Sequence, residues 1–120
     1  MKGLCRVFLV GRLGADPEVR TSAAGQPWST LSVATNRAER QGDQWVEKTD
    51  WHRVKVFGDR AEQCHRHLRS GSAIGVEGDL QYERWTDGEG RQRFSVSILA
   101  RRIDFIADFG AREAPARASA

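Results

Sequence analysis

The chain has 120 residues, of which 39% are hydrophobic and 29% are charged, and its formal net charge is +3. This length predicts one domain with a real core, and the composition excludes a disordered chain. The modest positive charge permits an acidic partner without requiring one.

The N-terminal segment and the cysteines bear on the compartment. The apolar run 8–10 lies between Arg6 and Arg12, so it is too short to span a bilayer and too charged for a signal peptide. Cys5 and Cys64 show no disulfide-framework spacing, which predicts reduced thiols. We therefore expect a cytoplasmic protein with no membrane partner.

The first half of the chain predicts three strands, because apolar and polar residues alternate between turn signals. They cover residues 6–13, 28–36 and 45–57. Segment 22–27 is a predicted hairpin loop, and segment 36–44 is a predicted charged loop.

The period then changes to that of a helix over residues 59–70. Asp59 begins a D-x-x-E pattern, in which we expect Asp59 to cap the first turn and Glu62 to return the hydrogen bond. The expected core face of this helix consists of Ala61, Cys64 and Leu68.

Two more strands follow, over residues 73–85 and 92–106, joined by a turn at 86–90. Gly75 and Gly78 predict a sharp bend or a bulge in the first of them.

Five glycine-curved strands with one helix predict an all-β fold, a small five-stranded Greek-key barrel of the oligonucleotide/oligosaccharide-binding (OB) type. This domain is expected over residues 1–109, followed by a flexible tail at 110–120 with no core-forming pattern. Period and spacing leave the strand order open.

The strand TDWHRVKVFG (49–58) separates two chemistries, because successive side chains on a strand point to opposite faces. One face carries His52, Val54 and Val56 and suits a core. The other face presents Trp51, Arg53, Lys55 and Phe57.

Aromatic plates separated by cations suit unpaired nucleic acid, whose bases have flat apolar faces and whose linkages are anionic. In a duplex the faces of the bases are covered by neighbouring bases, so these aromatic rings would have nothing to stack against. The segment RWTDGEGRQRF repeats the composition with Arg84, Trp85, Arg91, Arg93 and Phe94. The pattern favours a single-stranded nucleic-acid binder.

Other interpretations of these residues remain. Trp51 and Phe57 would also suit a subunit interface. Trp28 is expected to pack under the N-terminal turn rather than to stack. Trp45 fits ligand contact and loop packing equally well.

The cluster Cys64-His65-x-His67 has zinc-ligand chemistry, but these positions spread over a wide arc of a helix, so no metal site or cofactor is expected. No nucleophile motif accompanies Asp50 and His52, and no phosphate-binding loop appears, so no enzymatic activity is expected.

At these residues the chain also resembles a known family, the bacterial single-stranded DNA-binding proteins. The segments that carry the resemblance, in the family's order and spacing across roughly residues 4–108, are VFLVGRLGADPEVR, LSVATNR, WHRVKVFG, the helix leading into LRSGS, VEGDL and RWTDGEG. The resemblance implies an OB fold, a homotetramer, and binding of single-stranded DNA with little sequence preference and without catalysis.

The family's roles carry over by position. Trp51, Phe57 and Trp85 match the stacking aromatics, and the matching basic contacts are Arg53, Arg84 and Arg93. His52 matches a histidine associated with subunit assembly, and Gly14 matches a glycine in the turn after the first strand.

Some positions depart from the family. Arg37 begins the segment where the family has a further tryptophan. Trp45 could substitute for that tryptophan by folding over the ligand, and Arg37 and Trp45 are both candidate DNA contacts. Asp59, Ser70 and Glu83 stand where basic residues are common, which predicts reduced affinity or site size.

The C-terminal segment REAPARASA lacks the acidic, phenylalanine-tipped peptide through which the family recruits replication and repair proteins. The sequence is either truncated or that of a paralogue without recruitment, so such partners are not expected.

Two other functional classes remain. An OB-fold interaction module of primosome type would contact proteins and bind strands only incidentally, but the full set of stacking aromatics argues against it. A cold-shock-type RNA chaperone would be shorter and would lack the helix at 59–70. Nothing in the sequence identifies a 2′-hydroxyl contact, so DNA and RNA are not distinguished.

Overall fold

A computed structural model describes residues 1–106 of the chain. The predicted tail at 110–120 and the domain boundary at 109 lie outside the described residues. The elements, in chain order, are β1 (Arg6–Leu13), β2 (Arg20–Thr21), β3 (Pro27–Gln41), β4 (Gln44–Phe57), α1 (Asp59–His67), β5 (Ala73–Thr86) and β6 (Gln92–Phe105).

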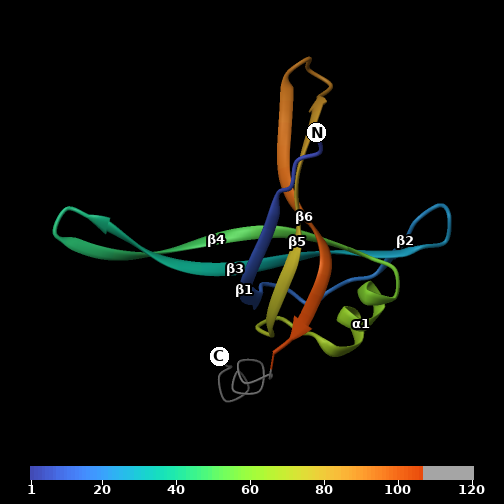
Figure 1. The fold of residues 1–120 in the computed structure, drawn as a ribbon, viewed down its shortest axis with the longest axis horizontal. Coiled ribbons are helices and arrows are strands. Elements are labelled where there is room, and N and C mark those ends of the chain that lie inside the picture. The colour runs from blue at the N-terminus through green and yellow to red at the C-terminus, as the bar shows by residue number, and fades with distance from the viewer. Residues whose placement is uncertain (107–120) are drawn as a thin grey trace.

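The long strands close into a barrel, as Figure 1 shows. The sheet order is β1-β5-β6-β4-β3-β2, and the additional pairing of β1 with β3 completes the ring. The contact of β4 with β6 is parallel, whereas the other pairings are antiparallel. The predicted five-stranded OB barrel is confirmed, and the two-residue β2 lies outside the ring.

The core lies inside this ring. The even face of β4 is buried at Val54 and Val56, as predicted, and meets Leu31 and Val33 of β3. Fully burying one such side chain stabilises the fold by about 1.5–3 kcal/mol. Helix α1 contributes a face formed by Ala61, Cys64 and Leu68, which is also the predicted one.

The prediction of a charged loop over residues 36–44 is wrong. Strands β3 and β4 stay paired along this whole segment, from Asn36–Thr49 to Gln41–Gln44. Gly42 turns the chain with a φ of 63° in a two-residue connection, which suits a type II′ hairpin turn. The charged residues therefore sit on a two-stranded arm that projects from the barrel (Figure 1).

The predicted capping box is also wrong. Gly58 is the N-cap, with a φ of 77°, and no side chain caps the helix. Asp59 and Glu62 lie within the first turn, where negative charge interacts favourably with the helix dipole. The helix ends at His67 rather than near Ser70, because Leu68 adopts an extended backbone and enters the core.

The predicted irregularity in β5 is confirmed at Gly78, where the register with β6 shifts between Glu77 and Gly78. A Cβ atom at Gly78 would lie 2.4 Å from the backbone oxygen of Leu99, so a side chain would separate the strands. Beyond this point β5 and β6 form a second projecting arm (Figure 1).

Within residues 1–106, no helix is both long enough and apolar enough to cross a membrane.

Candidate nucleic-acid interface

The odd face of β4 lies on the outside of the barrel. Trp51 is 59% exposed and Phe57 is 51% exposed, so both rings are accessible. Arg53 and Lys55 lie between them on the same face, because alternate residues of a strand share a side. The sequence-predicted grouping of these four side chains agrees with the strand's geometry.

The strand next to this face leaves room beside the large side chains. Ala34, Ser32 and Thr30 of β3 lie directly opposite Trp51, Arg53 and Lys55 respectively. Small side chains opposite large ones create a depression between them. One hollow of about 370 Å³ is bounded by residues of this region, namely Thr30, Leu31, Ser32, Trp51, His52 and Arg53.

Gly14 determines where the ring of Trp51 lies. A Cβ atom at Gly14 would be 2.5 Å from Cζ3 and 2.8 Å from Cη2 of that ring. Glycine at this position therefore lets the indole lie against the turn that follows β1. The sequence placed Gly14 in that turn but did not connect it with Trp51.

Trp28, which was expected to pack under the N-terminal turn rather than to stack, is half-buried on the same face. It lies directly opposite Phe57, and the Arg20 guanidinium carbon is 5.8 Å from the centre of its ring. A hollow of about 570 Å³ joins it to the β4 cations; its lining residues are Ala15, Asp16, Glu18, Arg20, Trp28, Thr30, Arg53 and Lys55.

The arm formed by β5 and β6 extends this face. Trp85 lies opposite Arg93, and Glu83 shares their side of the arm. The Glu83 carboxylate accepts a hydrogen bond from Lys55 Nζ at 2.9 Å. This contact joins the Trp85 side of the arm to the Trp51 side of the barrel. The exposed rings of Trp51, Phe57 and Trp85 therefore lie on one continuous side of the molecule.

Arg84 lies on the opposite side of the arm, across from Phe94. The sequence-predicted set at this hairpin is therefore divided between two faces. Arg91 is exposed beside the turn, with its Nε 4.0 Å from Glu89. The turn itself is held by the Asp87 carboxylate, which accepts hydrogen bonds from the backbone N–H groups of Glu89 and Arg91.

The predicted cations differ in their ion pairing. Lys55 is paired with Glu83, and the Nε of Arg93 donates to Asp87 at 2.9 Å. Arg53 and Arg84 form no ion pair with any of residues 1–106.

Arg37 and Trp45 lie on the other arm and face opposite ways. Trp45 shares the parity of Trp51 and lies beneath the guanidinium of Arg40, which is 5.9 Å from the centre of its ring. Arg37 lies on the His52 side and donates hydrogen bonds to Glu39 and Asp50 at 2.8 Å. These two hydrogen bonds raise the pKa of Arg37, with the bond to Glu39 contributing most, and they occupy donors on its Nε and Nη1 atoms.

His52 is half-buried and faces away from Trp51, as its parity predicted. Its Nε2 atom lies 2.8 Å from the hydroxyl of Thr35.

The side chains of the Cys64–His67 cluster diverge. Cys64 is buried in the core, His65 Nδ1 lies 2.9 Å from the backbone oxygen of Pro17, and the ring of His67 lies 5.9 Å from that of Phe105. No group of three or more His, Cys, Asp or Glu side chains within residues 1–106 is arranged to hold a metal ion.

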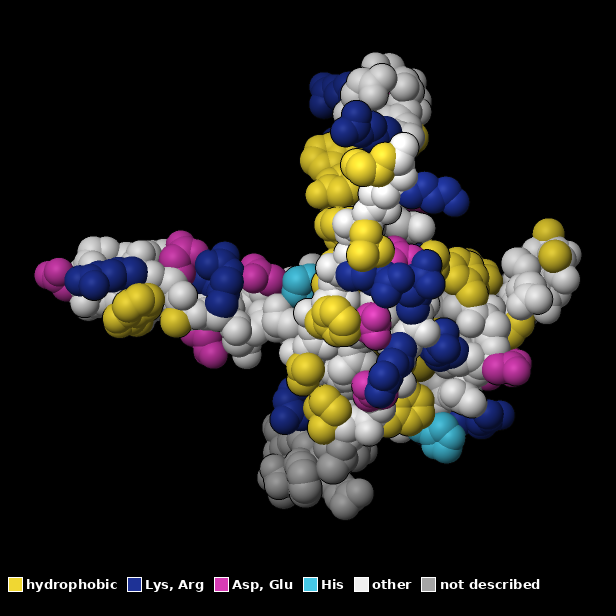
Figure 2. Space-filling model, in the orientation of Figure 1, with side chains coloured by type: hydrophobic (Ala, Val, Ile, Leu, Met, Phe, Trp, Pro, Cys, Tyr) yellow, Lys and Arg dark blue, Asp and Glu magenta, His cyan; other side chains and the backbone are white. Residues whose placement is uncertain are grey.

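A different part of the surface has a balanced charge. Asp79 accepts hydrogen bonds from Arg101 at 2.7 Å and from Arg6 at 2.8 Å. Both contacts lower the pKa of Asp79, and the contact with Arg101 has the larger effect. Figure 2 shows basic and acidic side chains interleaved over the barrel in this view. Arg6 and Arg101 are already paired with carboxylates, so each attracts a phosphate less than Arg53, which is unpaired within residues 1–106, does.

The comparisons with known proteins agree with this geometry. The model of the single-strand binding protein family matches residues 4–106. The "Single-stranded DNA-binding protein 1" of Xylella fastidiosa (strain 9a5c) is 42% identical over 108 residues, which cover 88% of this chain and 79% of that protein. The "Single-stranded DNA-binding protein" of Xanthomonas campestris pv. campestris is 37% identical over 111 residues, which cover 91% of this chain but only 64% of that protein.

Among solved structures, the chain in "Plasmodium falciparum SSB complex with ssDNA" has a TM-score of 0.80 and 26% sequence identity, covering 88% of this chain and 97% of that one. Together with the family match over nearly all of the described residues, these similarities mean that the chain belongs to the single-strand binding protein family.

Proposed function

We propose that this protein binds single-stranded DNA with little sequence preference and coats unwound DNA during replication, recombination and repair. One observation carries the proposal: exposed Trp51 and Phe57, with half-buried Trp28 opposite Phe57, lie around Arg53 on one outward face. We place the protein in the cytoplasm, on the DNA of the nucleoid, and its role is binding without a catalytic step.

Aromatic rings and cations contribute to binding in different ways. Each unstacked base that lies on an aromatic ring contributes about 1–3 kcal/mol, and this contribution tolerates any base because every base has a π-face. Arg53 has no carboxylate partner within residues 1–106, so it is free to neutralise a phosphate. Lys55 must first leave Glu83, 2.9 Å away, so its contribution is smaller.

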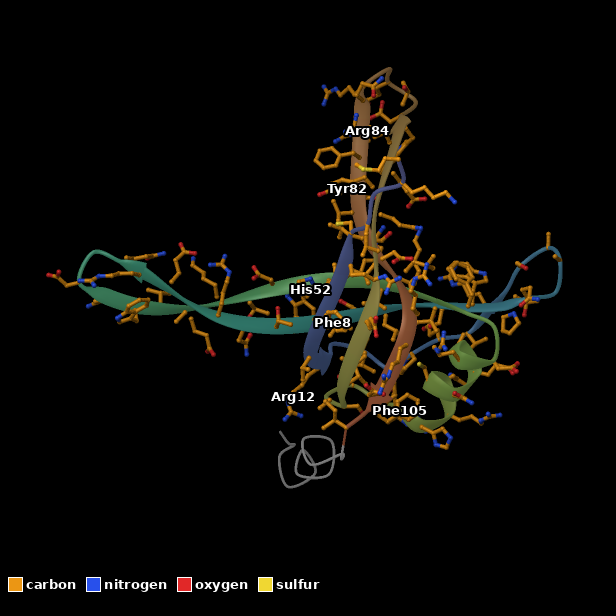
Figure 3. The ribbon with its side chains drawn as sticks, viewed as in Figure 1. Phe8, Arg12, His52, Tyr82, Arg84 and Phe105 are labelled. Carbon is orange, nitrogen blue, oxygen red and sulfur yellow. The ribbon has the colours of Figure 1, made fainter. Side chains whose placement is uncertain are left out.

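We also propose self-association into a homotetramer, with His52 at an interface between copies. Phe8 and Val10 of β1 support this, because they are 73% and 68% exposed and such apolar surface is typically covered by a partner. Figure 3 labels Phe8 and His52. Since His52 faces away from Trp51, a copy bound there would leave the stacking face open, and linked barrels raise the effective concentration of the next binding event.

The test of DNA binding is a tryptophan-fluorescence titration with oligo(dT) at several salt concentrations, with duplex DNA and oligo(rU) as competitors. We expect deep quenching that weakens with salt and that duplex does not reverse. In parallel, the Trp51→Ala variant should bind a labelled oligo(dT) roughly 5- to 150-fold more weakly, the stacking magnitude for one base.

The matched control is Phe105→Ala, which removes a ring that is 42% exposed and packs beside His67. Weak quenching, or equal competition by duplex, would mean that the aromatic face contacts proteins, and the primosome-type module would replace the present proposal.

A further inference from the structure

The arm formed by β5 and β6 has a second face, which carries Arg84 among the predicted DNA contacts but not Trp85. Tyr82 lies opposite Val96, and Arg84 lies opposite Phe94. These residues alternate with Glu83 and Trp85, so they point to the other side of the arm. Figure 3 labels Tyr82 and Arg84 on this arm.

This second face continues the inner face of the barrel. Leu80 and Ile98, the preceding pair on the same side, pack with the core. The arm then leaves the barrel, and the side chains on this face become exposed: Tyr82 is 60% exposed and Phe94 is 66% exposed. Figure 2 shows hydrophobic side chains along one flank of the arm, with basic side chains near its tip. Two large rings therefore lie on this face with more than half of their surface exposed.

The charge around these rings is positive. A hollow of about 250 Å³ is lined by Tyr82, Arg84, Gln92, Arg93 and Phe94, and no carboxylate is among these lining residues. Arg84 forms no ion pair within residues 1–106. Phe94 lies directly opposite Arg84, and Tyr82 is the next residue on the same face of β5, so both rings are neighbours of the Arg84 side chain.

Two other surfaces of the molecule lack this composition. The corresponding face of the β3–β4 arm is polar, and Arg37 there is held by Asp50 and Glu39. The apolar hollow beside Phe8 and Val10, of about 330 Å³, is lined by Glu77 and Asp104 as well as by Arg102. Within residues 1–106, rings beside an unpaired cation, without carboxylates, occur on the second face of the β5–β6 arm and in the hollow beside Trp51 and Arg53.

We propose that Tyr82, Arg84 and Phe94 form a second stacking surface for single-stranded nucleic acid, on the side of the β5–β6 arm opposite Trp85. This inference rests on the proposed function. A strand that has crossed the Trp51 groove passes around the arm, stacks bases on Tyr82 and Phe94, and places a phosphate against Arg84. The surface therefore acts only on strands long enough to reach beyond the first groove.

The experiment measures the affinity of the full chain for labelled oligo(dT) of increasing length. One OB fold covers about 4–16 nucleotides, so the series begins in that range and extends beyond it. The variant Tyr82→Leu/Phe94→Leu keeps apolar volume but removes both π-faces. We expect unchanged affinity for the shortest bound oligonucleotide and a loss of roughly 5- to 150-fold per stacked base for longer ones. Crosslinking by 5-bromodeoxyuridine, placed along the long oligonucleotide, should modify peptides containing Tyr82 or Phe94.

Val96→Ala is the control, because it trims an exposed apolar side chain of the same face that has no ring. Sedimentation of each variant without DNA gives its mass. Unchanged affinity for long strands would overturn the proposal, as would a change in mass, which would assign the face to contact between copies. If Trp51→Ala weakens binding while the double variant does not, this inference fails alone; if the unsubstituted chain binds no single strand, the proposed function fails with it.

Discussion

Replacing Gly14 with alanine should weaken DNA binding by displacing a ring rather than by removing it. The added methyl would lie 2.5 Å from Cζ3 of Trp51, whereas an ordinary carbon–carbon contact is about 3.5–4.0 Å. The ring must therefore move by about 1 Å or more. Because the indole is 59% exposed, it can swing outward without opening the core.

The magnitude follows from what Trp51 contributes. Loss of one stacked base costs about 1–3 kcal/mol, or roughly 5- to 150-fold in affinity, and this is the upper limit for Gly14→Ala. Gly14 is not among the glycines with positive φ, so alanine fits its backbone and the melting temperature should change little. Fluorescence anisotropy of labelled oligo(dT) gives the affinity, and circular dichroism gives the melting curve.

A double-mutant cycle tests the reasoning. In a Trp51→Ala background, Gly14→Ala should have no further effect on affinity, because the ring that it displaces is absent. Gly75→Ala is the control, since its methyl would lie no nearer than 3.8 Å to a neighbouring atom. Full affinity of Gly14→Ala, or an equal loss in both backgrounds, would refute the proposed link between the turn and the ring.

Two other predictions concern charge and thiol chemistry. Glu83→Gln should release Lys55 for a phosphate, so affinity for oligo(dT) should rise at low salt and the slope of log K against log salt should steepen by about 0.7. Glu62→Gln, which removes an equal charge from the helix, is the control; equal effects of the two would indicate net charge rather than the ion pair. Burial raises the pKa of Cys64 to about 11, so at pH 8 a thiol reagent should label exposed Cys5 rapidly and Cys64 only on unfolding. Rapid labelling of both thiols in the folded protein would contradict this.

Much of the site could be predicted because it depends on local rules. The alternation of Trp51, Arg53, Lys55 and Phe57 with apolar residues specifies which face is buried wherever the segment is extended. The helical spacing of Ala61, Cys64 and Leu68 likewise specifies a core face without knowledge of the neighbours.

Other features depended on which strands meet. The charged segment 36–44 forms an arm because β3 and β4 remain in register beyond the barrel, and pairing over such a distance leaves little trace in composition. Arg84 and Trp85 were grouped by composition, although they are consecutive in β5 and the alternation of a strand alone places them on opposite faces.

The sequence by itself therefore determined the kind of ligand and the residues that face it along β4, because strand periodicity is a local property of the chain. Only the tertiary structure decided that Gly14 supports the Trp51 ring, that Trp28 lies opposite Phe57, and that Lys55 is paired with Glu83. These contacts join residues from different strands, and which strands become neighbours depends on closure of the whole barrel.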